Sequence, residues 1–107
     1  MSPRELESDL LLKAAAKLQT EIDDWSLKGT RETLEHTLLY NRKLWQVFVT
    51  SVTADENPLP KPLKESIASL GVFVFACTMD ALKLQDPKKM MPVININRQI
   101  AAGLRGQ

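Results

Sequence analysis

An asparagine and an arginine interrupt an apolar helical pattern in the stretch Tyr40-Asn41-Arg42-Lys43-Leu44-Trp45. A related stretch near the C-terminus, Asn95-Ile96-Asn97-Arg98, again places these residue types within an apolar pattern. Asparagine is a mediocre helix former, because its side chain competes for nearby backbone hydrogen bonds. A helix that keeps such residues needs their hydrogen bonds, either for an internal polar network or for a surface that recognises a partner.

The segment around the first stretch is predicted to be a helix that begins after a Thr30 cap and frays near Ala54. Its apolar stripe is formed by Leu34, Leu38, Trp45, Phe48 and Val52, and is widened by Leu39, Leu44, Val47 and Val49. A helix that is apolar over most of its circumference lies in the middle of a bundle or beneath a partner.

The N-terminal segment predicts an earlier helix. Ser2 is a candidate cap, Pro3 suits the first turn, and Glu5 stands three positions after Ser2, as a capping box requires. Apolar residues then recur at three- and four-residue steps at Leu6, Leu10, Ala14, Leu18, Ile22 and Trp25. We expect this helix to fray from Trp25 onward and to end at Gly29.

Three prolines at positions 58, 60 and 62 form the clearest break in the chain and predict a stiff, extended connector. A third helix is expected from about Pro62, with its stripe at Leu63, Ile67, Leu70, Val74, Cys77 and Ala81. The run 70–76 could form a buried strand on composition alone. Its flanks are helical and no second strand is available to pair with it, so the helix is favoured.

Residues 86–89, which include Pro87, form a second break. A last helix is expected from near Met91 to Gly106, with Val93, Ile96, Ile100 and Leu104 on one stripe. The sequence therefore predicts an all-α fold, a small single-domain bundle of about four helices over residues 1–107, with sequence neighbours packed as hairpins.

Composition excludes several function classes. The 107 residues are 44% hydrophobic and 25% charged, with a formal net charge of +1, which is ordinary for one globular domain and unlike a polyanion binder. Cys77 is the only cysteine, which favours a reducing compartment. No N-terminal signal is evident and no apolar run approaches the ~18 residues of a membrane span. We expect a soluble, cytoplasmic protein without a membrane association.

No constellation of residues indicates catalysis, a metal or a cofactor. The single histidine, His36, has only Glu32 and Glu35 nearby, which makes a metal site improbable. Cys77 lies on an apolar stripe and is expected to be a buried structural thiol. The four glycines are scattered, so there is no phosphate-binding loop. We expect the protein not to be an enzyme.

The polar and aromatic residues of the two stretches allow two interpretations. Trp45 and Phe48 are one turn apart and could anchor a partner helix, although their place on the stripe favours the core. Asn41 and Arg42 could recognise a partner carboxylate or backbone, or could form internal ties, for example from Arg42 to an acid on the first helix. For the C-terminal stretch, we expect a structural role for Asn97, with Asn95 and Arg98 facing outward together.

The order of these landmarks resembles the FlaF family of flagellar biosynthesis proteins. The resemblance lies in residues 40–45, in Asn57-Pro58-Leu59-Pro60, in Leu70-Gly71-Val72-Phe73-Val74, in Ile94-Asn95-Ile96-Asn97-Arg98-Gln99-Ile100, and in Gly103-Leu104-Arg105. The opening Arg4-Glu5-Leu6-Glu7 and the pair Ala14-Ala15 are also similar. The match in order and spacing spans nearly the whole chain, with Pro62 as a departure.

The resemblance implies a small cytoplasmic helical protein needed for flagellin production and filament assembly. Family members resemble flagellin secretion chaperones that also influence flagellin synthesis together with the regulator FlbT. We therefore expect a groove that binds an amphipathic terminal helix of flagellin. The candidate partner-binding residues are Leu39, Arg42, Trp45, Phe48, Phe73, Phe75, Asn95 and Arg98.

The alternative is a post-transcriptional regulator of flagellin synthesis that acts through a partner such as FlbT. Direct binding to nucleic acid is not expected, because the only basic segment, residues 83–105, contains no Phe, Tyr or Trp. A homodimer is possible, since the second and third helices carry more apolar surface than a bundle of this size must bury.

Overall fold

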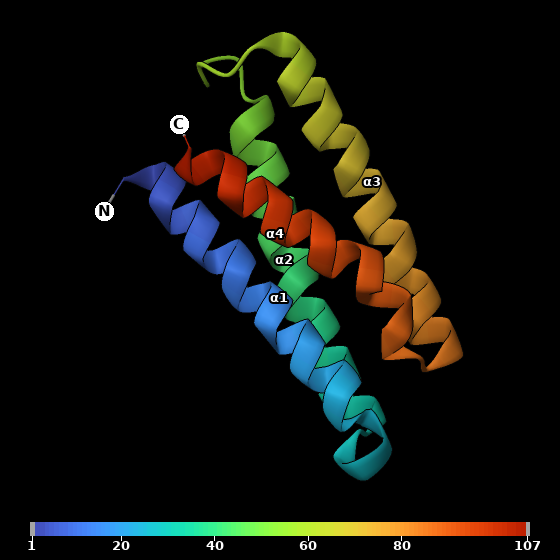
Figure 1. Cartoon of the computed structure of the whole chain (residues 1–107). Helices are drawn as coiled ribbons and strands as arrows, with labels where there is room; N and C mark the ends of the chain where they lie inside the picture. Colours follow the sequence, from blue (N-terminus) through green and yellow to red (C-terminus); the bar gives the residue numbers. More distant parts are fainter. Residues whose placement is uncertain (1, 107) are drawn as a thin grey trace.

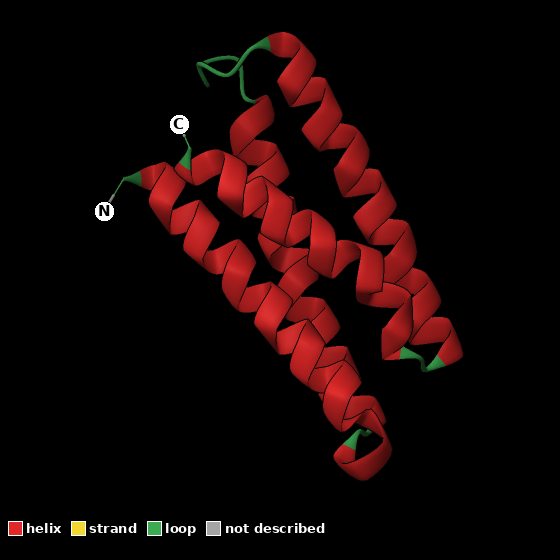
Figure 2. Ribbon diagram, in the orientation of Figure 1, coloured by secondary structure: helices red, strands yellow, loops and turns green. Residues whose placement is uncertain are grey.

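The computed structural model describes residues 2–106, and these form an elongated all-α bundle of 44 × 25 × 18 Å. Its elements, in chain order, are α1 (Pro3–Lys28), α2 (Arg31–Thr53), α3 (Lys61–Leu84), the short 3-10 helix η1 (Pro87–Met90) and α4 (Met91–Arg105). Successive long helices run in opposite directions (Figure 1). Short loops join them, apart from the longer connection between α2 and α3 (Figure 2). The predicted four-helix, all-α fold is confirmed.

Local signals in the sequence explain where the helices begin. The Ser2 hydroxyl accepts a hydrogen bond from the Glu5 N–H at 3.1 Å and caps α1. Thr30 and Thr33 form a reciprocal capping box at the start of α2, which satisfies two backbone donors that a helix leaves unpaired. These caps are local, so they could be recognised without knowledge of the tertiary structure.

The helix boundaries lie close to those predicted, and the clearest difference is at the end of α1. Helix α1 does not fray from Trp25 but continues to Lys28, because Trp25 packs against the core and the Gly29 N–H donates to the Trp25 carbonyl at 3.1 Å. Helix α3 begins at Lys61, one residue before the predicted start. The break at residues 86–89 contains the 3-10 turn η1, which leads directly into α4.

Helix α4 packs most closely along α1. Small side chains permit this approach, since Ala14, Ala15 and Ala101 are all buried. The buried Ser8 hydroxyl donates to the Ala101 carbonyl at 2.9 Å. The sequence predicted neighbours along the chain to pack as hairpins, and α1 with α2 and α2 with α3 do so; the additional packing of α1 on α4 was not predicted.

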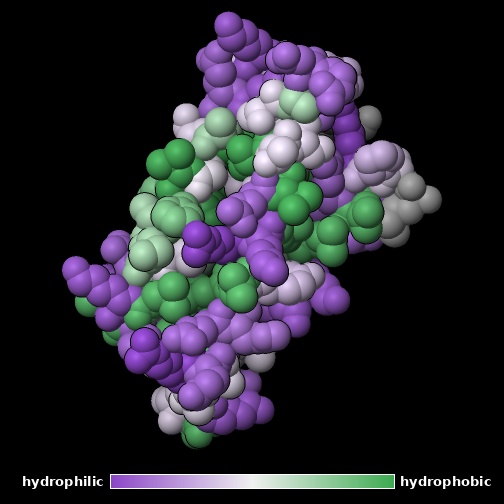
Figure 3. All heavy atoms as spheres, turned by 180° about the vertical axis from the view of Figure 1, so that it is seen from behind, coloured by the Kyte–Doolittle hydropathy of each residue, from purple (hydrophilic) through white to green (hydrophobic). Residues whose placement is uncertain are grey.

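Helix α3 lies at the edge of the bundle and packs mainly on α2. Its buried residues are Ile67, Val74, Thr78 and Ala81, whereas Val72, Phe73, Phe75, Met79 and Leu84 are exposed. Viewed from behind, apolar side chains gather over the α2–α3 side (Figure 3). Within residues 2–106, α3 is the one helix whose length and composition would suffice to cross a membrane. No such helix was predicted from the sequence.

Candidate partner-binding groove between α2 and α3

Three residues from the two polar stretches meet in the interior. The Trp45 indole N–H donates to Asn97 Oδ1 at 2.8 Å. The Asn97 amide donates to Asn41 Oδ1 at 2.8 Å and to the Leu11 carbonyl at 3.3 Å. Asn41, Trp45 and Asn97 are all buried, so they form an internal network that joins α1, α2 and α4. The expected structural role of Asn97 agrees with this placement.

The network leaves one polar atom unsatisfied, because Asn41 Nδ2 has no hydrogen-bond partner within residues 2–106. A buried amide group without a partner lowers stability. The packing of the surrounding helices must offset this cost, because the Asn41 NH₂ group makes no hydrogen bond of its own. Asn41 contributes an acceptor to the interior, and it is not available on the surface to recognise a partner.

Trp45 and Phe48 are core residues in this structure. Their rings lie 5.5 Å apart in an edge-to-face arrangement, with exposed fractions of 3% and 2%. Of the two interpretations open from the sequence, the structure places both in the core. Trp45 nevertheless borders a surface groove with one edge of its indole ring.

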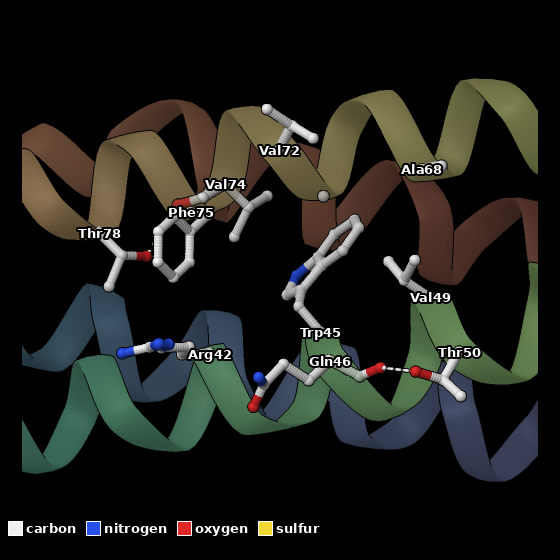
Figure 4. Close-up of a pocket in the computed structure, with 11 residues that line it drawn as sticks. Arg42, Trp45, Gln46, Val49, Thr50, Ala68, Val72, Val74, Phe75 and Thr78 are labelled. Atoms are coloured by element: carbon white, nitrogen blue, oxygen red, sulfur yellow. Dashed lines mark hydrogen bonds between the residues drawn. The ribbon is translucent and has the colours of Figure 1, made fainter.

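The groove runs between α2 and α3 and has a volume of about 410 Å³. Figure 4 shows side chains from both helices facing it. Its lining from α2 is Arg42, Trp45, Gln46, Val49 and Thr50, and its lining from α3 is Ala68, Gly71, Val72, Val74, Phe75 and Thr78. These positions recur at three- and four-residue steps on each helix, so the groove follows the helix pair for roughly three turns.

Gly71 determines how closely the two helices approach at the floor of the groove. A Cβ atom on Gly71 would lie 2.9 Å from Cγ2 of Val49 and 3.8 Å from Cε3 of Trp45. Since real Cβ atoms do not approach other carbons so closely, any side chain here would move α3 away from α2. The glycine therefore belongs to the groove as a packing residue.

Arg42 lies at one end of the groove and stacks on an aromatic ring. Its guanidinium carbon lies 4.7 Å from the centroid of the Phe75 ring. No ion pair within residues 2–106 involves Arg42. The internal tie from Arg42 to an acid on the first helix is thus not formed, and the cation is held by Phe75 instead.

Leu39 on α2 and Met79 on α3 are exposed apolar residues near the Arg42 end of the groove, outside its lining. Leu39 is three positions before Arg42, and Met79 is four after Phe75, so both continue the groove-facing lines. They are 50% and 47% exposed. Leu39 does not line the groove itself, and its contact with a partner stays a prediction.

Phe73 does not share this surface. It is two positions from Phe75, which separates the two side chains by about 200° around the helix axis. Phe73 is exposed on the opposite flank of α3 and does not line the groove. The sequence placed these two phenylalanines together because α3 is apolar around most of its circumference.

Asn95 and Arg98 also lie away from the groove. Both are exposed, as expected. Arg98 is seven positions before Arg105, and therefore lies on the same line of α4. Because Arg105 forms an ion pair with Asp9 of α1, this line follows the α1 flank. The structure thus brings Arg42 to the groove and leaves Arg98 at another part of the surface.

A family model described as flagellar protein FlaF matches residues 1–104 of the chain. The chain belongs to the FlaF family. No curated protein and no solved structure matches it. Among the residues that carry the FlaF resemblance, Asn41, Trp45 and Asn97 are buried, and Arg42, Trp45, Gly71 and Val72 line the groove.

The remaining reactive side chains of this FlaF protein are dispersed. Within residues 2–106, no group of three or more His, Cys, Asp or Glu side chains is positioned to hold a metal ion. Burial, with a contribution from the nearby Asp80 carboxylate, raises the pKa of the Cys77 thiol. Cys77 is half-buried rather than fully buried, and its raised pKa makes it a poor nucleophile.

Proposed function

We propose that this FlaF protein binds flagellin in the cytoplasm as an export chaperone, and thereby supports flagellin synthesis and filament formation. The observation that carries the proposal is the apolar groove between α2 and α3, in a member of a flagellar protein family. The protein acts by binding alone, without a catalytic step, a metal or a cofactor.

An amphipathic helix is a suitable ligand for such a groove. Helix-in-groove recognition uses apolar side chains spaced at three and four residues, which match a trough between two packed helices. The exposed apolar residues Val72 and Phe75 line the groove, and Leu39 and Met79 are further exposed apolar residues of the same two helices. Exposed apolar surface of this kind is characteristic of partner sites. Flagellin termini are amphipathic helices, and covering one would delay its polymerisation.

The alternative function is regulation of flagellin synthesis through a protein partner such as FlbT. The same groove could receive a helix of that partner, and the exposed Phe73 on the other flank of α3 leaves room for a second contact. Neither function requires contact with nucleic acid or a membrane. A homodimer through the apolar α3 surface is compatible with both.

The decisive experiment is calorimetric titration of the protein with flagellin from the same organism, full-length and truncated at either terminus. We expect one-to-one binding with a Kd in the micromolar range or tighter, and its loss when one terminal helix is removed. The absence of binding to every flagellin would contradict the chaperone proposal and direct the same titration to FlbT.

A pair of variants tests whether the groove is the contact. Val72→Asp introduces a charge into the groove, whereas Leu27→Asp introduces the same charge at an exposed apolar position at the end of α1. We expect Val72→Asp to weaken flagellin binding by about tenfold or more and Leu27→Asp to leave it unchanged. Equal effects of the two variants would place the binding site elsewhere.

A further inference from the structure

Arg42 is a cation in an apolar setting without a carboxylate partner. It is half-buried, it lines the groove, and it takes part in no ion pair within residues 2–106. Of the described residues that line the groove, Arg42 alone carries a charge. A ligand that covers the groove would remove water from this guanidinium, and an unpaired buried charge is strongly unfavourable. A suitable ligand therefore supplies a negative charge at this point.

The guanidinium is already held in place for such a contact. The guanidinium carbon lies 4.7 Å from the centroid of the Phe75 ring, and this cation–π contact holds the cation beside the groove. Figure 4 shows Arg42 from α2 and Phe75 from α3 facing each other across one end of the groove. A planar guanidinium binds a carboxylate through two parallel hydrogen bonds, which an ammonium group cannot reproduce.

The groove also favours a ligand whose backbone is helical. The Thr50 hydroxyl donates to the Gln46 carbonyl and the Thr78 hydroxyl donates to the Val74 carbonyl, both at 2.8 Å. These hydroxyl donors are therefore used within their own helices. An extended peptide would bring unpaired N–H and C=O groups into a mostly apolar trough, whereas a helix satisfies its own backbone. The groove is roughly three turns long, which suits a short helical segment.

We propose that the groove selects an amphipathic helix that carries an Asp or Glu between apolar residues, and that Arg42, held by Phe75, binds this carboxylate. The proposal rests on the proposed function, because the helix is taken to belong to flagellin. It deepens that function by identifying the side chain that sets the register of the bound helix. The apolar residues of the ligand contact Val49, Val72 and Leu39, and the carboxylate fixes which turn lies against them.

The test compares variants of two neighbouring cations in flagellin titrations. Arg42→Gln removes the groove charge, and Lys43→Gln removes an equal charge from an exposed position on the same helix. We expect Arg42→Gln to weaken flagellin binding by about tenfold or more, and Lys43→Gln by less than about twofold. Arg42→Lys keeps the charge without the planar fork and should also weaken binding. Phe75→Leu keeps the apolar contact and should have an intermediate effect.

A second set of variants changes flagellin, so that their effect on the wild-type protein does not depend on its folding. Each Asp or Glu of the bound flagellin helix is replaced by its amide, and binding is measured to the wild type and to Arg42→Gln. One replacement should weaken binding to the wild type by about tenfold and have little effect on binding to Arg42→Gln, since coupled residues are not additive.

The outcomes separate this inference from the function on which it rests. If flagellin binds the wild type and Arg42→Gln equally, the carboxylate contact is overturned and the chaperone function stands. If every acidic replacement acts equally on both proteins, the same conclusion follows. If no flagellin binds the wild type, the proposed function and the carboxylate contact fall together.

Discussion

The two sides of helix α2 differ in how far other helices cover them. Toward α1 and α4, α2 presents Asn41 and Trp45 to a buried polar network that closes on Asn97. Toward the outer flank of α3, it presents Arg42, Val49 and Thr50 to an open groove. The closed side stabilises the bundle and the open side has spare apolar surface. We infer that folding depends on the first and partner binding on the second.

The largest expected effect on stability comes from disrupting the hydrogen-bond network on the side of α2 that faces α1 and α4. Asn97→Ala removes the partner of the Trp45 indole and of the Asn41 carbonyl, and leaves a small cavity. Each buried polar group without a partner costs about 1–3 kcal/mol. We expect the free energy of unfolding to fall by about 3–5 kcal/mol in urea denaturation. Asn95→Ala, at an exposed position of the same helix, should change it by less than about 0.5 kcal/mol. Equal values for the two variants would contradict the structural role of the network.

A pair of glycine variants tests how tightly the open side is packed. Gly103→Ala meets no atom within 4 Å and should raise stability by about 0.5–1 kcal/mol through helix propensity. Gly71→Ala places its Cβ against Val49, which is stiff and β-branched. The resulting strain of about 1–3 kcal/mol should outweigh the gain and lower stability. If thermal unfolding shows an equal rise for both variants, α3 does not pack closely on α2.

A third comparison separates stability from binding within α3. Both valines border the groove, but Val72 is 73% exposed at its surface, whereas Val74 is 1% exposed and belongs to the core. Val74→Ala should lower the free energy of unfolding by about 1–3 kcal/mol. Val72→Ala should change it by at most about 0.5 kcal/mol while weakening flagellin binding. A large loss of stability in Val72→Ala would show that the groove lining supports the fold.

The smallest expected effect concerns the Cys77 thiol. Burial and the Asp80 carboxylate raise its pKa, so fewer molecules carry the thiolate at a given pH. Alkylation by iodoacetamide between pH 7 and 9 should be slower in the folded protein than in urea, and should rise at higher pH than for an unperturbed thiol. Asp80→Asn should speed the reaction, because it removes one of the two causes. Equal rates in folded and unfolded protein would indicate that α3 detaches readily from α2.

The helices could be predicted closely from the sequence because their signals are local. Ser2 and Thr30 cap the backbone within three residues, and the prolines at 58, 60 and 62 prevent a helix from continuing. The extension of α1 to Lys28 was missed, since it depends on the packing of Trp25 against the rest of the bundle. The pairing of α1 with α4 was also missed, because periodicity does not identify the neighbour of an apolar stripe.

The candidate site could be predicted only in part. Arg42 and Phe75 do lie together at the groove, but Phe73 and Arg98 lie on other flanks of the molecule, and Trp45 and Phe48 are buried. The signal that could have separated the two phenylalanines is their spacing of two residues, which on any helix directs them to different sides. The rotation of α3 about its own axis decides which of them faces α2.

The sequence by itself determined the all-α class, the positions of the helices, the family resemblance and the need for polar partners inside an apolar segment. The tertiary structure decided which polar residues are internal and where the open surface lies. The physical reason is that capping and proline effects act within one turn of helix. Which side of an apolar helix is turned toward the core depends instead on its packing against the other helices. Contacts such as Gly71 against Val49, and Trp45 against Asn97, join residues that lie far apart along the chain.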